Sequence, residues 1–123
     1  MQDYKKLVVW AKAHQLVLCV HRSTNKWRRR SDAALASQLR RAAAAVPASI
    51  AEGCHRRSRS EFRRYLEIAY ASAGEVDYHL LLARDTGVLP AAEYDDLQEK
   101  TAQVKRMLAG LVRRLSAAID ADH

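Results

Sequence analysis

Apolar residues recur at alternating steps of four and three along the second half of the chain. The first series makes three unbroken heptads and consists of Phe62, Leu66, Ala69, Ala73, Val76, Leu80 and Ala83. The second series consists of Leu97, Thr101, Val104, Leu108, Leu111, Leu115 and Ala118. Because this spacing puts apolar side chains on one face of a helix, it predicts two long amphipathic helices, over about 59–86 and 90–118.

The first half of the chain has the same periodicity, and it predicts helices over about 5–26 and 32–53. Their apolar series are Trp10, Ala13, Val17, Val20, Thr24 and Trp27, and then Leu35, Leu39, Ala42, Val46 and Ser49 or Ile50. The first helix has further apolar residues off this face, at Leu7, Ala11, Leu16 and Leu18. A helix that is apolar on more than one side needs more than one partner, so we expect a subunit contact in addition to the bundle.

Residues that begin helices lie between these series. Ser31 or Asp32 is a candidate N-cap for the second helix. Ser58, with Glu61 three residues later, makes a capping-box pattern at the start of the third helix. Pro90 suits the first turn of the fourth helix.

Three other residues predict kinks or helix ends. Pro47 lies inside the second helix, where it removes a backbone donor and predicts a kink. Gly53 is placed to end that helix in the left-handed conformation, and Gly87 closes the third helix. The chain has only four glycines and two prolines in 123 residues, which favours short connections. These features predict an all-α, up-down-up-down antiparallel four-helix bundle that occupies residues 1–123 as a single domain.

Positive charge is concentrated in the middle of the sequence. The formal net charge is +7, and eleven of the 21 Lys and Arg residues but only three of the 14 Asp and Glu residues lie between Lys26 and Arg64. This balance suits an acidic partner such as nucleic acid or an anionic protein surface. It suits equally a protein whose charge only keeps it soluble.

The predicted topology divides the arginines between the two ends of the bundle. Residues 28–30 share an end with the turn between the third and fourth helices, whose acids we expect to neutralise them in part. Those acids are Asp85, Glu93, Asp95 and Asp96. The arginines that follow the second helix lie at the opposite end and face few acids.

We therefore predict a nucleic-acid site at the end that holds the turn between the second and third helices. Its binding residues are Arg56, Arg57, Arg59, Arg63 and Arg64, with Arg40 and Arg41 in support partway along the second helix. The N-terminal dipole of the third helix also favours an anion there. The structural corner of the site consists of Glu52, Gly53, Ser58 and Glu61.

Glu52 is expected to pair with Arg56, Arg57 or an arginine of the first turn, because a carboxylate beside an arginine cluster more often organises that corner than reacts. A second interpretation stays equally open. In that interpretation the end is only a solvated surface, whose guanidiniums pair with Glu52, Glu61 and Glu67.

The sequence contains no recognisable catalytic or metal-binding set. A single Glu-x-x-His spacing, from Glu52 to His55, falls short of the two pairs that a di-iron bundle needs. His14 and His21 share a helix face, with Cys19 nearby, but lack a third fixed ligand. We find no serine nucleophile pattern and no glycine-rich phosphate loop. We therefore expect no enzyme activity, no cofactor and no metal.

Targeting signals are also missing from the sequence. We find no signal-peptide pattern and no apolar stretch long enough to span a bilayer. We therefore expect a cytoplasmic location with no membrane association.

Several blocks of the sequence resemble a known family, the 23S ribosomal RNA intervening-sequence proteins. The blocks are the segments 7–13, 38–42, 50–53 and 60–62, followed by Arg57, Tyr65 and Leu66, residues 69–75 and Leu108. Within them, Gln38-Leu39-Arg40-Arg41-Ala42 and Ala51-Glu52-Gly53 are the more specific. The chain departs from the family at Ala45 and Ser49, where a serine and an asparagine are usual, and at Trp27-Arg28, where Phe-Pro is usual.

The resemblance implies an up-and-down four-helix bundle that assembles as a homopentamer. It also implies kinship with the accessory variability determinant of diversity-generating retroelements, a basic pentameric barrel that binds nucleic acid and a reverse transcriptase.

Two hypotheses follow for the function of the chain. The first is a homo-oligomeric bundle, pentameric by resemblance, that binds RNA or DNA through its basic surface. The second is an assembly or adaptor protein that binds an acidic protein, such as a reverse transcriptase, without touching nucleic acid.

Overall fold

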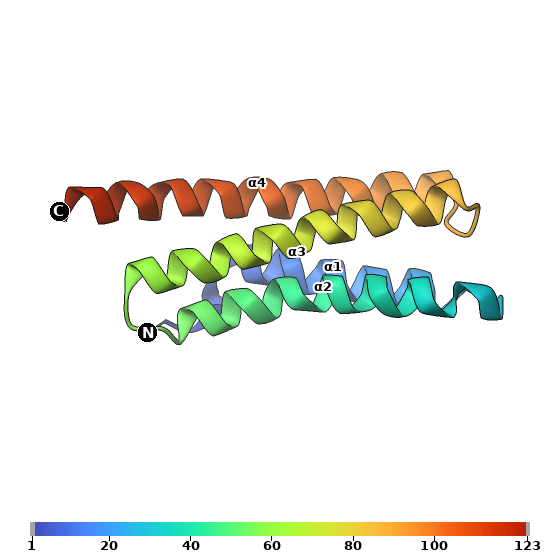
Figure 1. Cartoon of the computed structure of the whole chain (residues 1–123), viewed down its shortest axis with the longest axis horizontal. Coiled ribbons are helices and arrows are strands. Elements are labelled where there is room, and N and C mark those ends of the chain that lie inside the picture. Colours follow the sequence, from blue (N-terminus) through green and yellow to red (C-terminus); the bar gives the residue numbers. More distant parts are fainter. Residues whose placement is uncertain (1, 123) are drawn as a thin grey trace.

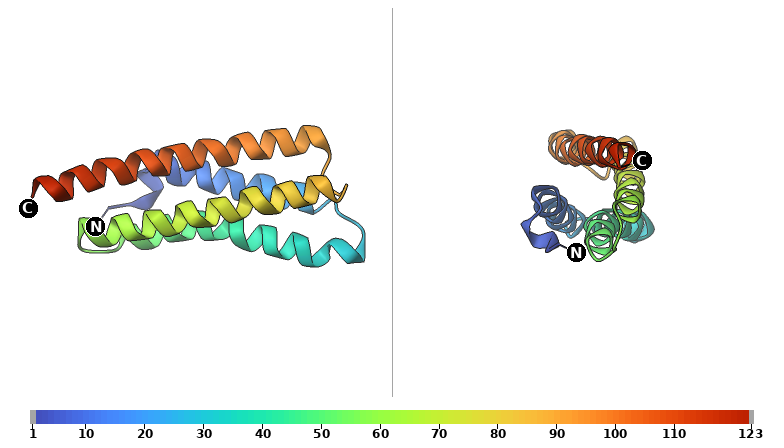
Figure 2. Two further views of the ribbon diagram at one scale, coloured as in Figure 1. Left: turned by 45° about the horizontal axis from the view of Figure 1, so that its top comes forward. Right: turned by 90° about the vertical axis from the view of Figure 1, so that its left-hand side faces the viewer.

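Six helical segments make up the structure, a computed structural model that describes residues 2–122. In chain order they are the 3-10 helix η1 (Tyr4–Lys6), α1 (Val8–Thr24), the 3-10 helix η2 (Arg30–Asp32), α2 (Ala33–Cys54), α3 (Arg59–Asp85) and α4 (Ala91–Ala121). Successive long helices run in opposite directions (Figure 1). Each packs against the next, and α1 closes the ring by packing against α4 (Figure 2). The predicted all-α antiparallel four-helix bundle is confirmed.

The first helix differs from its prediction at its N-terminal end. The Asp3 carboxylate accepts the Lys5 backbone N–H at 3.0 Å and starts the short helix η1. Leu7 then adopts an extended conformation, with φ −80° and ψ 127°, so α1 begins at Val8 instead of about residue 5. At the other end of the chain, α4 continues to Ala121, beyond the predicted residue 118.

The core lies where the four helix seams meet. All seven heptad residues of α3 are buried, as the spacing predicts. In α4 the first four of the series are buried, from Leu97 to Leu108. The last three, Leu111, Leu115 and Ala118, are only half-buried. The C-terminal end of α4 extends past the beginning of α1 (Figure 1), so α1 covers less of this part of the helix.

The buried face of α1 is rotated from the predicted one. Its buried residues are Val9, Ala13, Leu16, Val20, Ser23 and Thr24. Trp10 and Val17 are instead half-buried at the edge of the core. Trp10 packs edge-on against Tyr4 with ring centroids 5.0 Å apart and stacks on His14 at 5.1 Å. The large indole is therefore accommodated beside η1, and smaller residues fill the bundle interior.

Gly53 has a different role from the one predicted. It lies inside the last turn of α2, and among residues 2–122 the only glycine with positive φ is Gly87, at 83°. A Cβ atom on Gly53 would lie 2.9 Å from both Phe62 Cδ1 and Tyr65 Cβ. The glycine therefore allows α2 and α3 to approach closely at this end, and the prediction of a left-handed helix end is wrong.

The other boundary residues follow their predictions more closely. Ser58 caps α3, with its Oγ accepting the Glu61 backbone N–H at 3.1 Å and donating to Glu61 Oε1 at 3.3 Å. Gly87 follows the end of α3 in the left-handed region. Asp32 precedes α2, but its carboxylate does not cap the helix because it binds Arg29 instead. α2 continues through Pro47 without ending.

Candidate nucleic-acid interface

Five arginines gather at the turn between α2 and α3 and at the beginning of α3. Arg56 and Arg57 follow α2 directly, and the Ser58 cap then starts α3 so that its first two turns carry the other three. A hollow of about 190 Å³ lies at this corner, lined in part by Arg56, Arg57 and Arg59. We call this end of the molecule the arginine corner, comprising Arg56, Arg57, Arg59, Arg63 and Arg64.

Arg56 is the most constrained of the five. Its guanidinium forms an ion pair with Glu52 one turn earlier, as predicted. It also donates to the Tyr65 hydroxyl at 2.8 Å and lies 4.8 Å from the centre of the Tyr65 ring. These contacts tie the end of α2 to the first turns of α3, so Arg56 has a structural part in the corner.

Two more arginines are paired with carboxylates. Arg63 Nε lies 3.5 Å from Glu67, and its Nη1 lies 3.4 Å from the Ser116 hydroxyl of α4. Arg59 forms an ion pair with Asp122, just beyond the end of α4. The sequence did not predict the contribution of Asp122, because the fourth helix was expected to end at about residue 118 and not at Ala121. The length of α4 is what brings this carboxylate to the arginine corner.

Arg57 and Arg64 have no carboxylate partner within residues 2–122. Both are exposed, and the Arg64 guanidinium lies 5.6 Å from the centre of the Tyr65 ring. They can therefore bind a phosphate without breaking an ion pair, whereas Arg56, Arg59 and Arg63 would have to exchange one partner for another. The interpretation of a solvated end stays open beside the nucleic-acid site, because Glu52 and Glu67 do pair with Arg56 and Arg63.

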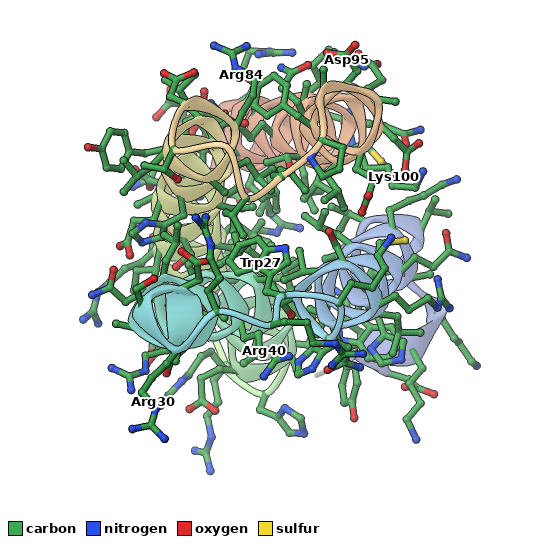
Figure 3. All side chains as sticks on the ribbon, turned by 90° about the vertical axis from the view of Figure 1, so that its right-hand side faces the viewer. Trp27, Arg30, Arg40, Arg84, Asp95 and Lys100 are labelled. Carbon is green, nitrogen blue, oxygen red and sulfur yellow. The ribbon has the colours of Figure 1, made fainter. Side chains whose placement is uncertain are left out.

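Arg40 and Arg41 lie away from the arginine corner. Fourteen helical residues separate Arg40 from the end of α2 at Cys54, which is about 21 Å at 1.5 Å per residue. Arg40 instead joins the other end of the bundle, where its Nε donates to Thr24 Oγ1 at 2.7 Å and its Nη2 to Asn25 Oδ1 at 2.8 Å (Figure 3). Arg40 and Arg41 lie partway along α2, as predicted; their support of binding at the arginine corner stays a prediction.

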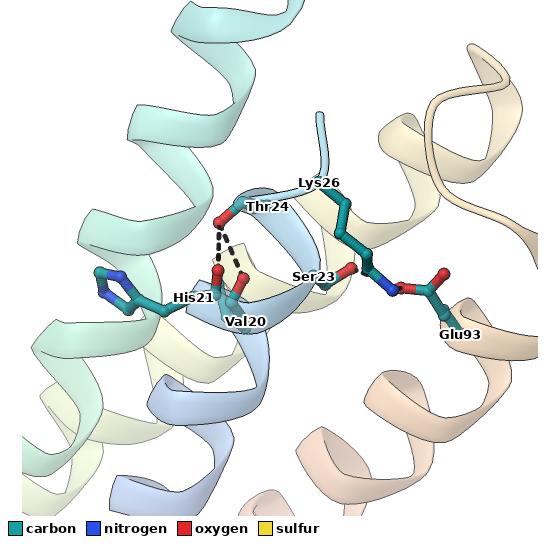
Figure 4. A network of polar contacts seen from close by, with 6 residues as sticks. All are labelled: Val20, His21, Ser23, Thr24, Lys26 and Glu93. Carbon is teal, nitrogen blue, oxygen red and sulfur yellow. Dashed lines mark hydrogen bonds and ion pairs between the residues drawn. The ribbon is translucent and has the colours of Figure 1, made fainter. Parts of the chain in front are cut away.

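Within residues 2–122, the acids near the turn between α3 and α4 form no ion pair with residues 28–30. Glu93 pairs with Lys26 at 2.9 Å and accepts from the Ser23 hydroxyl at 2.9 Å (Figure 4). The Lys26 ammonium lowers the pKa of Glu93 below its usual range, and the Ser23 hydrogen bond adds to that effect. Asp85 pairs with its neighbour Arg84, and Asp96 pairs with Lys100. Position in the sequence did not predict which Lys or Arg side chain each of these acids would pair with.

Within residues 2–122, no three His, Cys, Asp or Glu residues are grouped so that they could hold a metal ion. Cys54 is buried, and burial raises the pKa of its thiol, with Asp3 contributing in the same direction. None of the helices between residues 2 and 122 has the length and apolar character to cross a membrane.

Comparison with known proteins gives a consistent result. The sequence model of the family described as 23S rRNA-intervening sequence protein matches residues 5–110. A crystal structure of a protein of unknown function from the S23 ribosomal protein family, from Bacteroides thetaiotaomicron, superimposes with a TM-score of 0.79. The two chains are 22% identical, and the match covers 85% of this chain and 98% of the other. Among curated proteins there is no match.

Proposed function

The chain belongs to the 23S rRNA-intervening sequence protein family, and from that premise we propose that it is a non-enzymatic, cytoplasmic helical bundle that binds RNA or DNA through the arginine corner. The observation that carries the proposal is the pair Arg57 and Arg64, two exposed guanidiniums that have no carboxylate partner in the part of the chain that the structure describes. Phosphate oxygens accept hydrogen bonds from guanidinium in a bidentate manner, so a nucleic-acid backbone is a matched partner.

Self-association strengthens the proposal, and the family resemblance gives its form as a homopentamer. Val8 is 63% exposed at the start of α1, and Leu18 is 41% exposed on the same helix. Leu111 and Leu115 continue the apolar seam of α4 and are only half-buried against the core. Contact with further copies would cover these side chains, and several arginine corners on one particle would bind a single strand with higher avidity.

A second candidate function has its own observation. Ile68, Tyr70 and Tyr78 are large side chains exposed on α3, at 39%, 42% and 59%. Aromatic residues of this kind are enriched in protein interfaces. They favour an adaptor that binds an acidic protein such as a reverse transcriptase, in line with the kinship to the accessory variability determinant that the resemblance implies.

Titration of labelled RNA and duplex DNA at low salt distinguishes these functions. The double variant Arg57→Glu, Arg64→Glu should weaken binding at least about tenfold, since contacts to phosphate dominate non-specific affinity. The variant Arg22→Glu, Arg106→Glu changes the net charge equally on other surfaces and should stay within about threefold of the wild type. Equal losses of affinity in the two double variants would mean that binding depends on the net charge of the protein and not on the arginine corner. Binding of an acidic protein that survives in Arg57→Glu, Arg64→Glu would favour the adaptor instead.

A further inference from the structure

A second basic recess lies at the opposite end of the bundle, between the α1–α2 turn and the beginning of α2. Its volume is about 450 Å³. The side chains that matter here are Trp27, Arg28, Arg29, Arg30, Asp32 and Arg40. Figure 3 looks onto this end, with Trp27 near its centre and Arg40 beside it. Four guanidiniums against a single carboxylate make the recess strongly positive, and we call it the Arg40 recess.

Arg40 is fixed in place before any ligand arrives. Thr24 donates its hydroxyl proton to the Val20 carbonyl at 2.8 Å, with the His21 carbonyl at 3.3 Å (Figure 4). The Thr24 oxygen is thus left to accept from Arg40 Nε, while Asn25 accepts from Nη2. A guanidinium has five donors, so this anchoring leaves three N–H groups for a ligand. Because these hydrogen bonds already order the side chain in the folded protein, ligand binding costs little further side-chain entropy.

Asn25 connects this group to a second guanidinium. Its backbone carbonyl accepts from Arg28 Nη1 at 3.2 Å while its side chain accepts from Arg40. Two cations are therefore held in one recess by neutral acceptors. The only acid in the lining, Asp32, is already bound to Arg29 at 2.9 Å. Within residues 2–122, Arg28, Arg30 and Arg40 pair with no carboxylate.

We infer that the Arg40 recess binds the phosphate of a nucleotide unit, with Arg40 and Arg28 contacting the phosphate and Trp27 forming the wall beside the sugar and base. A phosphate supplies the acceptors that these guanidiniums lack and relieves their mutual repulsion. The volume exceeds that of phosphate alone and falls within the range of small-ligand sites. This site goes beyond the proposed function, because it lies at the end opposite to the arginine corner.

The two tryptophans of the chain, Trp10 and Trp27, make a direct assay possible. In a Trp10→Phe background Trp27 is the sole indole, and its emission reports on the recess. The probes are inorganic pyrophosphate, a nucleoside triphosphate and a short oligonucleotide. We expect a saturable change in emission. Affinity should fall at least about tenfold in Arg28→Gln, Arg30→Gln, because charge-assisted hydrogen bonds to phosphate are lost.

Two further variants complete the experiment. Arg57→Gln, Arg64→Gln removes the two arginines of the arginine corner that lack a carboxylate partner within residues 2–122, and it should leave the Trp27 titration unchanged. Failure of the proposed function and failure of this inference are therefore distinguishable. Arg40→Gln should abolish binding. Because Arg40 also ties α2 to α1, circular dichroism checks that this variant is folded. If the variant unfolds, Arg28→Gln, Arg30→Gln still decides the question, because Arg28 and Arg30 are exposed.

Saturation by the small probes identifies a free nucleotide as the ligand, and saturation by the oligonucleotide alone identifies a nucleic-acid phosphate. Absence of saturation with all three probes, or equal affinity in Arg28→Gln, Arg30→Gln, would overturn the inference.

Discussion

At the scale of single residues, Gly53 shows how one position can have two explanations. From the sequence, a glycine near a helix end indicates a left-handed turn. In the structure, Gly53 is helical, and its missing side chain allows α2 to contact Phe62 and Tyr65 of α3. The local pattern was informative about where α2 ends, but the reason for the glycine is a tertiary contact that no local pattern contains.

The glycine explanation predicts opposite effects at two positions. Gly53→Ala should destabilise the protein by about 1–3 kcal/mol, because its Cβ would meet Tyr65 Cβ, an atom that moves only with the backbone of α3. Gly74→Ala is the matched control, since Gly74 lies inside α3 and an added Cβ would have no atom within 4 Å apart from its chain neighbours and the backbone of its own helix. It should stabilise by roughly 0.5–1 kcal/mol. Urea unfolding at one fixed protein concentration measures both, and a neutral or stabilising Gly53→Ala would contradict the close-packing account.

At the scale of helices, the sequence predicted the buried residues correctly for a helix that is apolar on only one face. The heptad series of α3 is buried throughout because α3 packs between α2 and α4. The prediction was less accurate for α1, whose apolar residues cover more than one face, so spacing alone did not select between Trp10 and Val9. Likewise, the sequence located the arginine corner and its Glu52 pair. It did not predict the contacts from α4, because Asp122 and Ser116 reach the corner only through the full length of that helix.

A pH-dependent contact links the end of α1 to the beginning of α4. Because Lys26 lowers the pKa of Glu93, the pair stabilises the fold above the ordinary carboxyl pKa of 4.5 and loses its effect as pH falls through the lower, folded-state pKa. Glu93→Gln should therefore cost up to about 1 kcal/mol at pH 7, since Lys26 is largely exposed. That cost should shrink in more acidic buffer, below the ordinary pKa.

The exposed pair Glu99 and Arg106 provides the control for this contact. Glu99→Gln should have almost no effect at either pH, because both partners are solvated. Chemical unfolding of the two variants and the wild type at neutral and acidic pH makes the comparison. If Glu93→Gln lowers the free energy of unfolding equally at both pH values, the ion pair with Lys26 is not the source of that loss.

At the scale of the whole molecule, the uncovered end of α4 predicts self-association. Light scattering at micromolar concentration should give a mass several times the 13.9 kDa of the chain, and five times for the pentamer. Leu111→Lys, Leu115→Lys should lower that mass while helix content is retained, because charge cannot be buried in an apolar contact. Ala117→Lys changes an exposed position of the same helix and should leave the mass unaltered. A monomeric wild type would contradict this prediction.

The central claim is that Arg57 and Arg64 bind nucleic-acid phosphates, and the salt dependence of binding tests it most directly. For duplex DNA the logarithm of the affinity should fall linearly with the logarithm of salt concentration, by about 0.9 per phosphate contact. Arg57→Gln, Arg64→Gln should make that slope shallower by about 2 for each subunit that contacts the duplex. Identical slopes in the wild type and this variant, or binding that is insensitive to salt, would contradict the claim.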